Sequence, residues 1–198
     1  MKNNKILFLG NANCPLFNWL VDQGEDVMQT TDKISLSLLN LYQISFIISY
    51  GYRHIITSDV IQAYQNHAIN LHISLLPWNK GCSPNLWSFV ENTPKGVSIH
   101  YIDEGIDTGD IIAQEEVFFV NEKETLTTSY NSLHQTMHTL FKKHWSMIKN
   151  KTCNREVQNS LGTYHNINDE KLILKSLAHG WHTPIAQITN LPVKPTHF

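Results

Sequence analysis

The stretch Ile44–Tyr50, ISFIISY, decides the fold class because it is an uninterrupted β-branched and aromatic run that stops at Gly51. A run that is apolar on consecutive residues, rather than on alternate ones, is typical of a strand buried on both faces of a parallel sheet. Two further runs, Lys5–Leu9 (KILFL, stopped by Gly10) and Ala68–Ile73, lie on either side of it in the chain. We interpret all three as parallel strands of one sheet.

Segments with apolar residues at helical spacing separate these strands. Asn13-Cys14-Pro15 is typical of a helix start, and Gly24 ends the pattern that follows it. The other expected elements of this half are a strand over Asp26–Gln29, a helix over Ile34–Tyr42 and a helix capped by Ser58 or Asp59. Alternating strands and helices predict βαβ units, and therefore an α/β fold with a doubly wound, mostly parallel, Rossmann-like sheet.

The second half of the chain begins with a predicted loop over Leu75–Gly81 and ends in a less regular tail. Between them we expect a helix over Asn85–Glu91, strands over Gly96–Ile102 and Ile111–Val117, and a helix over Thr125–Ile148. The last of these is the clearest, because its apolar residues are spaced by three and four. The pattern predicts one main domain over residues 1–150 and a short C-terminal extension over 151–198, which packs on the domain or serves in a homodimer.

Composition narrows the class of partner. The chain has 198 residues, 41 % hydrophobic and 16 % charged, with a formal charge of −2. This length is enough for one domain that buries roughly 70 % of its unfolded surface. The charge balance does not favour a nucleic-acid backbone or an anionic membrane, and no apolar run approaches the ~20 residues of a bilayer span. The short apolar run Ile6–Leu9 is not a secretory signal, so we expect a cytoplasmic protein that binds neither nucleic acid nor membrane.

Metal-ligating residue types are present but do not form a recognisable site. Cys14, Cys82 and Cys153 are far apart and form no CxxC pair, which favours neither a zinc site nor a disulfide framework. His134 and His138 share a helix face but lack the HExxH pattern. The sequence therefore predicts no metal.

The strand Ala68–Ile73 carries two polar residues, Asn70 and His72, that a period of two places on one face. They lie at the carboxyl end of the strand, where open α/β sheets bind ligands. An amide beside an imidazole can stabilise an oxyanion. The alternative is that both residues only anchor a loop. We interpret His100, on a later strand, as a residue whose position indicates burial and no further role.

A second candidate element is Asp103–Asp110, DEGIDTGD, which packs four carboxylates and two glycines between two predicted strands. Gly105 and Gly109 permit a tight loop that approaches a ligand closely, and one of its carboxylates can orient His72. A plain surface turn remains an alternative. A calcium loop does not, because the spacing of the carboxylates differs from that of an EF-hand.

Two motifs carry a resemblance to a known family. Asn70–Pro77 (NLHISLLP) resembles the Asn-x-His-x-Ser-x-Leu-Pro motif of the folate-dependent formyltransferases, and Asp103–Ile112 (DEGIDTGDII) resembles their second motif. The similarity extends from about Ile47 to Val117. It implies the formyltransferase version of the Rossmann-like fold, with N10-formyltetrahydrofolate as the co-substrate that donates the formyl group.

The resemblance also implies roles for individual residues. Asn70, His72 and Asp107 are expected to be catalytic, while an amine of the acceptor attacks the formyl carbon. The residues expected to hold the folate, largely through backbone groups, are Ser49, Tyr50, Gly51, His54 and Ile56, with Gly105 and Ile106 on the other side of the pocket.

The acceptor is expected to be a small amine, a dTDP- or UDP-linked amino deoxysugar. Gly10 and Asn11 in the first loop, and Trp78 and Lys80 after the catalytic strand, are the candidate acceptor contacts. In the tail, Tyr164, His165 and Trp181 either contact a nucleotide or only pack the tail onto the domain. The alternatives are a phosphoribosylglycinamide-type formyltransferase, a formyltetrahydrofolate hydrolase and a non-catalytic folate- or nucleotide-binding module.

Overall fold

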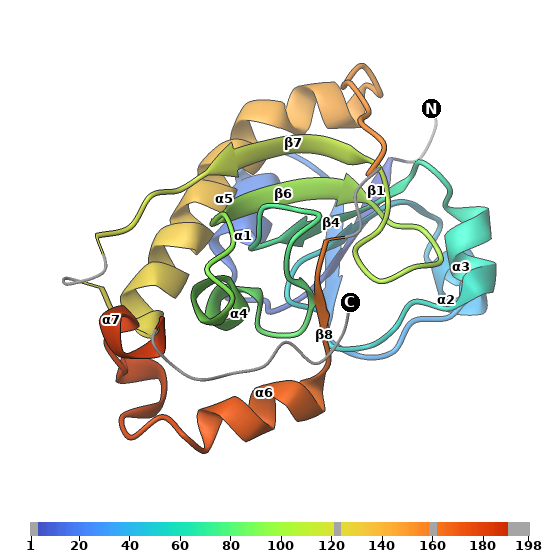
Figure 1. Ribbon diagram of the computed structural model, residues 1–198. Helices are drawn as coiled ribbons and strands as arrows, with labels where there is room; N and C mark the ends of the chain where they lie inside the picture. Colours follow the sequence, from blue (N-terminus) through green and yellow to red (C-terminus); the bar gives the residue numbers. More distant parts are fainter. Residues whose placement is uncertain (1–3, 121–123, 159–161, 190–198) are drawn as a thin grey trace. The chain divides into compact units, whose positions relative to one another are not determined.

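The computed structural model describes residues 4–120, 124–158 and 162–189, and Figure 1 labels their helices and strands. The chain forms two compact units. Unit 1 contains residues 1–72 and 99–110, and unit 2 contains residues 73–98 and 111–198. The chain therefore crosses from one unit to the other three times.

Unit 1 begins with four strands joined by helices. In chain order these elements are β1 (Lys5–Leu9), α1 (Pro15–Asp22), β2 (Val27–Thr30), α2 (Leu36–Leu41), β3 (Ile44–Ser49), α3 (Ser58–Ala63) and β4 (Ala68–His72). β1 pairs in parallel with β2 and with β3, and β3 pairs in parallel with β4. Parallel neighbours need a crossover connection, which the helices supply. The predicted βαβ pattern is confirmed.

The main sheet has the strand order β2-β1-β3-β4-β6-β7, where β6 is Gly96–Tyr101 and β7 is Ile111–Glu116. The N–H of Tyr101 donates to the carbonyl of Asp110 over 2.9 Å, and the N–H of Val117 donates to Lys95 over 2.8 Å. From one bonded pair to the other, the residue number decreases on β6 while it increases on β7. The two strands are therefore antiparallel. The sheet is thus mostly parallel with an antiparallel hairpin at one edge, which confirms the predicted fold class.

Continuous apolar strands form the core of unit 1. In β1 the four residues from Ile6 to Leu9 are each at most 3 % exposed. Leu7 and Leu9 join a cluster that also contains Ile34, Leu39, Ile44, Ile47, Val60, Tyr64 and Ala68. Each fully buried Leu or Ile side chain contributes about 1.5–3 kcal/mol relative to exposure. Burial on both faces explains why these strands are apolar on consecutive residues.

Unit 2 is rich in helices. Besides β7 it contains β5 (Lys80–Gly81), α4 (Pro84–Val90), α5 (Leu126–Lys149), β8 (Tyr164–His165), α6 (Ile167–Leu174), the 3₁₀ helix η1 (Gly180–His182) and α7 (Ile185–Ile188). Figure 1 shows α5 alongside β7, and residues of the two elements are in contact. Apolar residues of α4, α6 and α7 share one cluster with Leu126 at the start of α5.

Helix α5 follows directly from its sequence. The hydroxyl of Thr125 accepts a hydrogen bond from the N–H of Thr128 over 3.2 Å, and the N–H of Thr125 donates to the Thr128 hydroxyl over 2.9 Å. These reciprocal bonds form a capping box. Its buried residues include Leu133, Met137, Leu140, Phe141, Trp145 and Ile148, spaced mostly by three and four. The helix predicted over Thr125–Ile148 is confirmed to within one residue at each end.

The structure differs from the sequence interpretation in three places. The segment predicted as a loop over Leu75–Gly81 ends in the short strand β5, whose partner β8 comes from the tail. The helix expected to be capped by Ser58 or Asp59 has Thr57 as its N-cap. The less regular tail contains α6, η1 and α7. Strand β5 forms because the tail supplies its partner, and the helices of the tail form with contacts elsewhere in the chain. The N-cap of α3 differs from the prediction by only one residue.

Part of the predicted C-terminal extension, residues 159–161 and 190–198, lies outside the described residues. The predicted boundary at residue 150 stays a prediction. Over the described ranges, no helix combines the length and the hydropathy of a membrane-spanning segment.

Candidate active site

The carboxyl ends of three neighbouring strands bring the first candidate residues together. Leu9 on β1 is in register with Ser49 on β3, and Ser49 is in register with Asn70 on β4. β1 has β2 on one side and β3 on the other, so Gly10 and Tyr50 follow the sheet at a topological switch point, where such folds bind ligands. A Cβ on Gly10 would lie 2.4 Å from the carbonyl oxygen of Tyr50. Only glycine permits that approach.

Asn70 and His72 occupy alternate positions on β4, as their spacing predicts. Asn70 is partly buried, and His72 is 7 % exposed. Leu71, between them, is 3 % exposed. Because successive strand residues point to opposite faces, Asn70 and His72 share the face that Leu71 does not. The strand therefore holds an amide and an imidazole side by side.

The loop between β6 and β7 presents Asp107 in an unusual backbone conformation. Asp107 has a φ of 54°, in the left-handed region. The carboxylate of Asp103 shapes the loop by accepting hydrogen bonds from the Gly105 N–H (3.2 Å) and the Thr108 hydroxyl (2.7 Å). A Cβ on Gly109 would lie 1.9 Å from the Tyr101 carbonyl oxygen, so glycine is required there. Among these carboxylates, Asp103 holds the loop and Asp107 faces β4.

The Asp107 carboxylate contacts both residues on β4. Its Oδ1 accepts a hydrogen bond from Asn70 Nδ2 over 3.0 Å, and its Oδ2 lies 3.5 Å from His72 Nδ1. The Asp107 side chain is only 11 % exposed. Residues 37 positions apart, such as Asn70 and Asp107, thus form one polar cluster. Within it, the imidazole lies at ion-pair distance from a largely buried carboxylate.

His100 on β6 joins the same cluster, which sequence reasoning did not anticipate. Its Nε2 lies 3.3 Å from Asp107 Oδ1 and 3.2 Å from Asn70 Nδ2, and its Nδ1 lies 2.8 Å from the carbonyl oxygen of Tyr101. A carbonyl oxygen only accepts, so Nδ1 carries a hydrogen. His100 is 2 % exposed, and burial is all that its sequence pattern predicted. The missing information was that β6 lies next to β4 in the sheet.

The residues expected to hold a folate all belong to unit 1 and lie in two segments. Ser49 and Tyr50 are buried, and Gly51 has a φ of 67°. The ring of His54 meets the ring of Tyr52 edge to face, with centroids 5.3 Å apart. Ile56 packs against the core cluster of unit 1.

The remaining candidates of unit 1 lie in the β6–β7 loop and in the loop after β1. Ile106 is 44 % exposed. A Cβ on Gly105 would lie 2.0 Å from the Thr108 hydroxyl, so a larger residue here would displace that hydroxyl from its hydrogen bond to Asp103. Asn11 is exposed, and its side-chain oxygen accepts a hydrogen bond from the N–H of Asn13 over 2.9 Å.

Trp78 and Lys80, the other candidate acceptor contacts, belong to unit 2. Trp78 is 36 % exposed, and its carbonyl oxygen accepts a hydrogen bond from the Ser74 hydroxyl over 2.7 Å. Lys80 is 9 % exposed and is the first residue of β5. Asn79, between them, is fully buried and has a φ of 57°. This segment is therefore built into its unit rather than left as a solvated loop.

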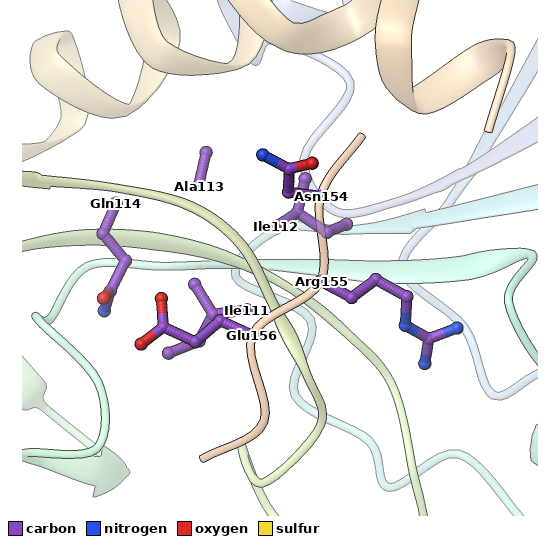
Figure 2. A pocket seen from close by; sticks show the side chains of 7 residues that line it. All are labelled: Ile111, Ile112, Ala113, Gln114, Asn154, Arg155 and Glu156. Atoms are coloured by element: carbon purple, nitrogen blue, oxygen red, sulfur yellow. The ribbon is translucent and has the colours of Figure 1, made fainter. Parts of the chain in front are cut away.

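A shallow hollow of about 590 Å³ lies elsewhere in unit 2 and contains none of these candidates. Figure 2 shows its lining, which comes from Ile111–Gln114 on β7 and from Asn154–Glu156 opposite. The Gln114 amide donates to the Leu76 carbonyl over 2.8 Å and to the Ser98 hydroxyl over 2.7 Å. Ile111 and Glu156 form an antiparallel bridge across it. These bonds hold the Gln114 amide and the backbone of Glu156 within the unit.

Comparison with known proteins identifies a family. The family model described as formyl transferase matches residues 21–144 of the chain. The phosphoribosylglycinamide formyltransferase of Bacillus subtilis (strain 168) is 37 % identical over 101 residues, which are 50 % of this chain and 51 % of that protein. The methionyl-tRNA formyltransferase of Pelotomaculum thermopropionicum is 32 % identical over 122 residues, 61 % of this chain and 36 % of that one. The chain thus spans about half, or less, of the length of these curated relatives.

A solved structure is similar over nearly the whole chain. The formyltransferase PseJ from Anoxybacillus kamchatkensis, in complex with UDP-4,6-dideoxy-4-formamido-L-AltNAc and tetrahydrofolate, is 45 % identical. The match covers 93 % of this chain and 97 % of the PseJ chain, with a TM-score of 0.88.

Proposed function

Because the chain belongs to the formyl transferase family, we propose that it transfers a formyl group from N10-formyltetrahydrofolate to the primary amine of a small acceptor. The observation that carries this proposal is the contact of the buried Asp107 carboxylate with both Asn70 and His72. These are the three residues that the two family motifs assign to catalysis. The complex of PseJ with tetrahydrofolate and a formamido sugar nucleotide supports the same reaction.

Asn70 and His72 stabilise the charge that develops during the reaction. When the acceptor amine adds to the formyl carbon, the carbonyl oxygen becomes an oxyanion. The Asn70 amide and the His72 imidazolium, held on one face of β4, donate hydrogen bonds to it. Preorganised donors of this kind are worth roughly 10²–10³ in rate each. No covalent bond to the protein is needed.

Asp107 sets the state of His72. Its Oδ2 lies 3.5 Å from His72 Nδ1, so the carboxylate favours a hydrogen on that nitrogen. The opposite ring nitrogen, Nε2, is then the donor toward substrate. Both ring nitrogens of the His72 imidazolium carry hydrogen, so Asp107 accepts the proton lost by the amine and returns it to the leaving nitrogen. Atoms and charge balance without any oxidant or reductant.

The segment after β3 fits a flat heterocyclic donor. Over the described residues, no main-chain hydrogen bond uses the N–H groups of residues 51–56. These groups, together with the rings of Tyr52 and His54, offer polar contacts and aromatic faces to a pterin. The folate supplies an activated formyl group on N10, and the protein supplies position and electrostatics.

We further propose that the acceptor is an amino deoxysugar linked to UDP or dTDP. PseJ covers 93 % of this chain, whereas the similarity to the phosphoribosylglycinamide enzyme covers only half of it. Trp78 and Lys80 contact the nucleotide part in this proposal, and Gly10 and Asn11 line the loop at the end of β1. A lysine acts as a point charge toward phosphate.

The test is a formyl-transfer assay with the purified full chain. N10-formyltetrahydrofolate is supplied with UDP- and dTDP-linked 3- and 4-amino deoxysugars, with glycinamide ribonucleotide, or without acceptor. Mass spectrometry follows a gain of one formyl group on the acceptor. Formylation of an amino sugar nucleotide is the expected result. Formate release at the same rate without acceptor indicates a hydrolase, and neither transfer nor folate binding contradicts the proposal.

His100 is expected to act as a positioning residue for Asn70. With the hydrogen on Nδ1, its Nε2 accepts a hydrogen bond from Asn70 Nδ2 over 3.2 Å, which orients the amide beside Asp107. A hydrogen bond between neutral groups is worth about 0.5–1.5 kcal/mol, so His100→Leu should lower kcat roughly 2- to 10-fold with little change in KM. His100→Gln, whose side-chain oxygen can accept the same bond, should restore most of the kcat. Equal loss in both variants would assign His100 to packing alone.

A further inference from the structure

The tail of unit 2 docks on residues 77–81 of the same unit, which are called the 77–81 loop below. The Thr163 N–H donates to the Pro77 carbonyl over 3.3 Å, and the Thr163 carbonyl accepts from the Lys80 N–H over 2.9 Å. A Cβ on Gly162 would lie 1.9 Å from the Pro77 carbonyl oxygen, and Gly162 has a φ of 59°, so this position requires glycine. The backbone of the tail therefore follows the backbone of the loop closely.

The side chain of Thr163 also bonds to the loop. Its Oγ1 accepts a hydrogen bond from the Asn79 N–H over 2.9 Å and a longer one from Asn79 Nδ2 over 3.4 Å. Asn79 is fully buried, so water does not replace this acceptor. A buried N–H that loses its acceptor is costly. Thr163 thus satisfies a backbone donor at the centre of the loop.

The side chain of Asn79 belongs to a buried polar network. Its Oδ1 accepts from the Thr93 hydroxyl over 2.7 Å, and its Nδ2 donates to Glu91 Oε2 over 3.2 Å. The other Glu91 oxygen lies 3.1 Å from Nε2 of His165, a tail residue that is 4 % exposed. The His165 ring stacks on Trp87, with centroids 3.7 Å apart. A buried network whose members are bonded to one another favours a single conformation.

The backbone of this region adopts conformations that its local sequence does not favour. Asn79, Gly81 and Ser83 have φ values of 57°, 85° and 51°. Two of these residues carry a Cβ, which the left-handed region disfavours. Such conformations persist where surrounding contacts enforce them, and they are concentrated in functional sites. The contacts from Thr163 and from the network of Asn79 are the ones that enforce them here.

We propose that Thr163 is a positioning residue, which holds the 77–81 loop in the conformation that binds the acceptor. This inference rests on the proposed function, in which Trp78 and Lys80, the two neighbours of Asn79, contact the acceptor. A ligand that binds only one conformation of a loop loses apparent affinity in proportion to the fraction of molecules in that conformation. By keeping the loop in one conformation, Thr163 lowers the KM for the acceptor without contacting it.

Steady-state kinetics of the full chain test this role. Thr163→Val replaces the hydroxyl with a methyl group of similar size. It should raise the KM for the formylated amino sugar nucleotide roughly 2- to 10-fold, the range expected for one lost hydrogen bond. The kcat and the KM for N10-formyltetrahydrofolate should stay unchanged, because the change affects acceptor binding alone. Thr163→Ser, which keeps the hydroxyl, should stay close to wild type.

The matched control is Thr136→Val. Thr136 is half-buried, as Thr163 is, and its hydroxyl donates to the Ser132 carbonyl within α5 over 3.1 Å. This variant should keep the wild-type KM for both substrates.

Hydrogen exchange of the peptide that covers residues 76–82 gives a readout that needs no acceptor. The N–H groups of Asn79 and Lys80 both donate to Thr163. They should exchange faster in Thr163→Val than in wild type, whereas α5 should exchange at the wild-type rate in both. Thr163→Ser should restore the slow exchange of the loop.

The other outcomes overturn the positioning role. Equal exchange of residues 76–82 in wild type and Thr163→Val contradicts it, and so does faster exchange throughout α5, which would assign Thr163 to general stability. Formyl transfer with an unchanged KM in Thr163→Val, or with an equal rise in Thr163→Ser, rejects the positioning role alone. Absence of formyl transfer to any amine rejects the proposed function, and the exchange comparison then still decides whether Thr163 holds the loop.

Discussion

Replacing Asp107 with asparagine is expected to lower kcat for formyl transfer by about 10³-fold or more. The amide cannot stabilise an imidazolium at His72, and it no longer fixes which ring nitrogen carries the hydrogen. In hydrolases where a carboxylate orients a catalytic histidine, the same change costs about 10⁴ in kcat. The effect should fall on kcat rather than KM, because the carboxylate acts on charge that develops in the transition state.

This substitution should change catalysis without changing the stability of the fold. Asp107 has a φ of 54°, and asparagine tolerates that left-handed conformation as aspartate does. The two side chains also have the same shape. Thermal unfolding of Asp107→Asn should therefore match wild type, and steady-state kinetics of the same preparations give kcat and KM.

The matched control is Glu104→Gln in the same loop. Glu104 is exposed, and its Oε1 accepts a hydrogen bond from Gln62 Nε2 over 3.2 Å, which a glutamine oxygen can also accept. Its kcat should equal that of wild type. An Asp107→Asn enzyme that keeps more than about a third of wild-type kcat would remove Asp107 from the mechanism.

Acid should destabilise the protein through His134 on α5. Burial, and then repulsion from His138, lowers the pKa of His134 from 6.5 to about 4. The ring of Tyr130 covers it, with centroids 4.1 Å apart. Because the folded state resists protonation, the unfolded state binds the proton first as pH falls. The stabilisation is fully present above about pH 6.5 and is lost between pH 6.5 and 4.

The size of this effect follows from linkage. A tenfold change in proton affinity corresponds to about 1.4 kcal/mol, so the free energy of unfolding should fall by on the order of 3 kcal/mol across that window through His134 alone. The pKa of His138 is also lowered, by burial and then by Lys142, and it contributes in the same direction.

Urea unfolding at several pH values between 8 and 4 measures the loss, and variants isolate it. His134→Gln should show a shallower decline of the free energy of unfolding than wild type over pH 6.5 to 4. His144→Gln, on the same helix, should keep the wild-type slope. If His134→Gln and wild type decline in parallel, His134 is not the group that titrates.

The sequence predicted the βαβ order and α5 well, because these depend on local patterns. An apolar run stopped by glycine, as in Lys5–Leu9, predicts a strand whatever its position in the sheet. The spacing of apolar residues in Thr125–Ile148 gives a helix before any tertiary contact forms. The placement of Asn70 and His72 on one face also follows from a local period of two.

Other parts of the candidate site needed information that no local pattern contains. The residues alone did not select among the carboxylates of the β6–β7 loop, and only the family resemblance pointed to Asp107. The structure separates them, since Asp103 bonds within the loop whereas Asp107 contacts Asn70. His100 had no signal beyond burial, because its contacts depend on which strand lies beside β4.

By itself, then, the sequence determined the fold class, the principal elements of secondary structure and the polar pair on β4. The tertiary structure alone decided that His100 lies against Asp107 and that Tyr164 lies opposite Lys80. The physical reason is that a strand or helix is selected by the periodicity of neighbouring residues, whereas strand order and register bring distant residues into contact. Such distant contacts place the Asp107 carboxylate beside His100, and they pair β5 with β8 so that Lys80 lies in register with Tyr164.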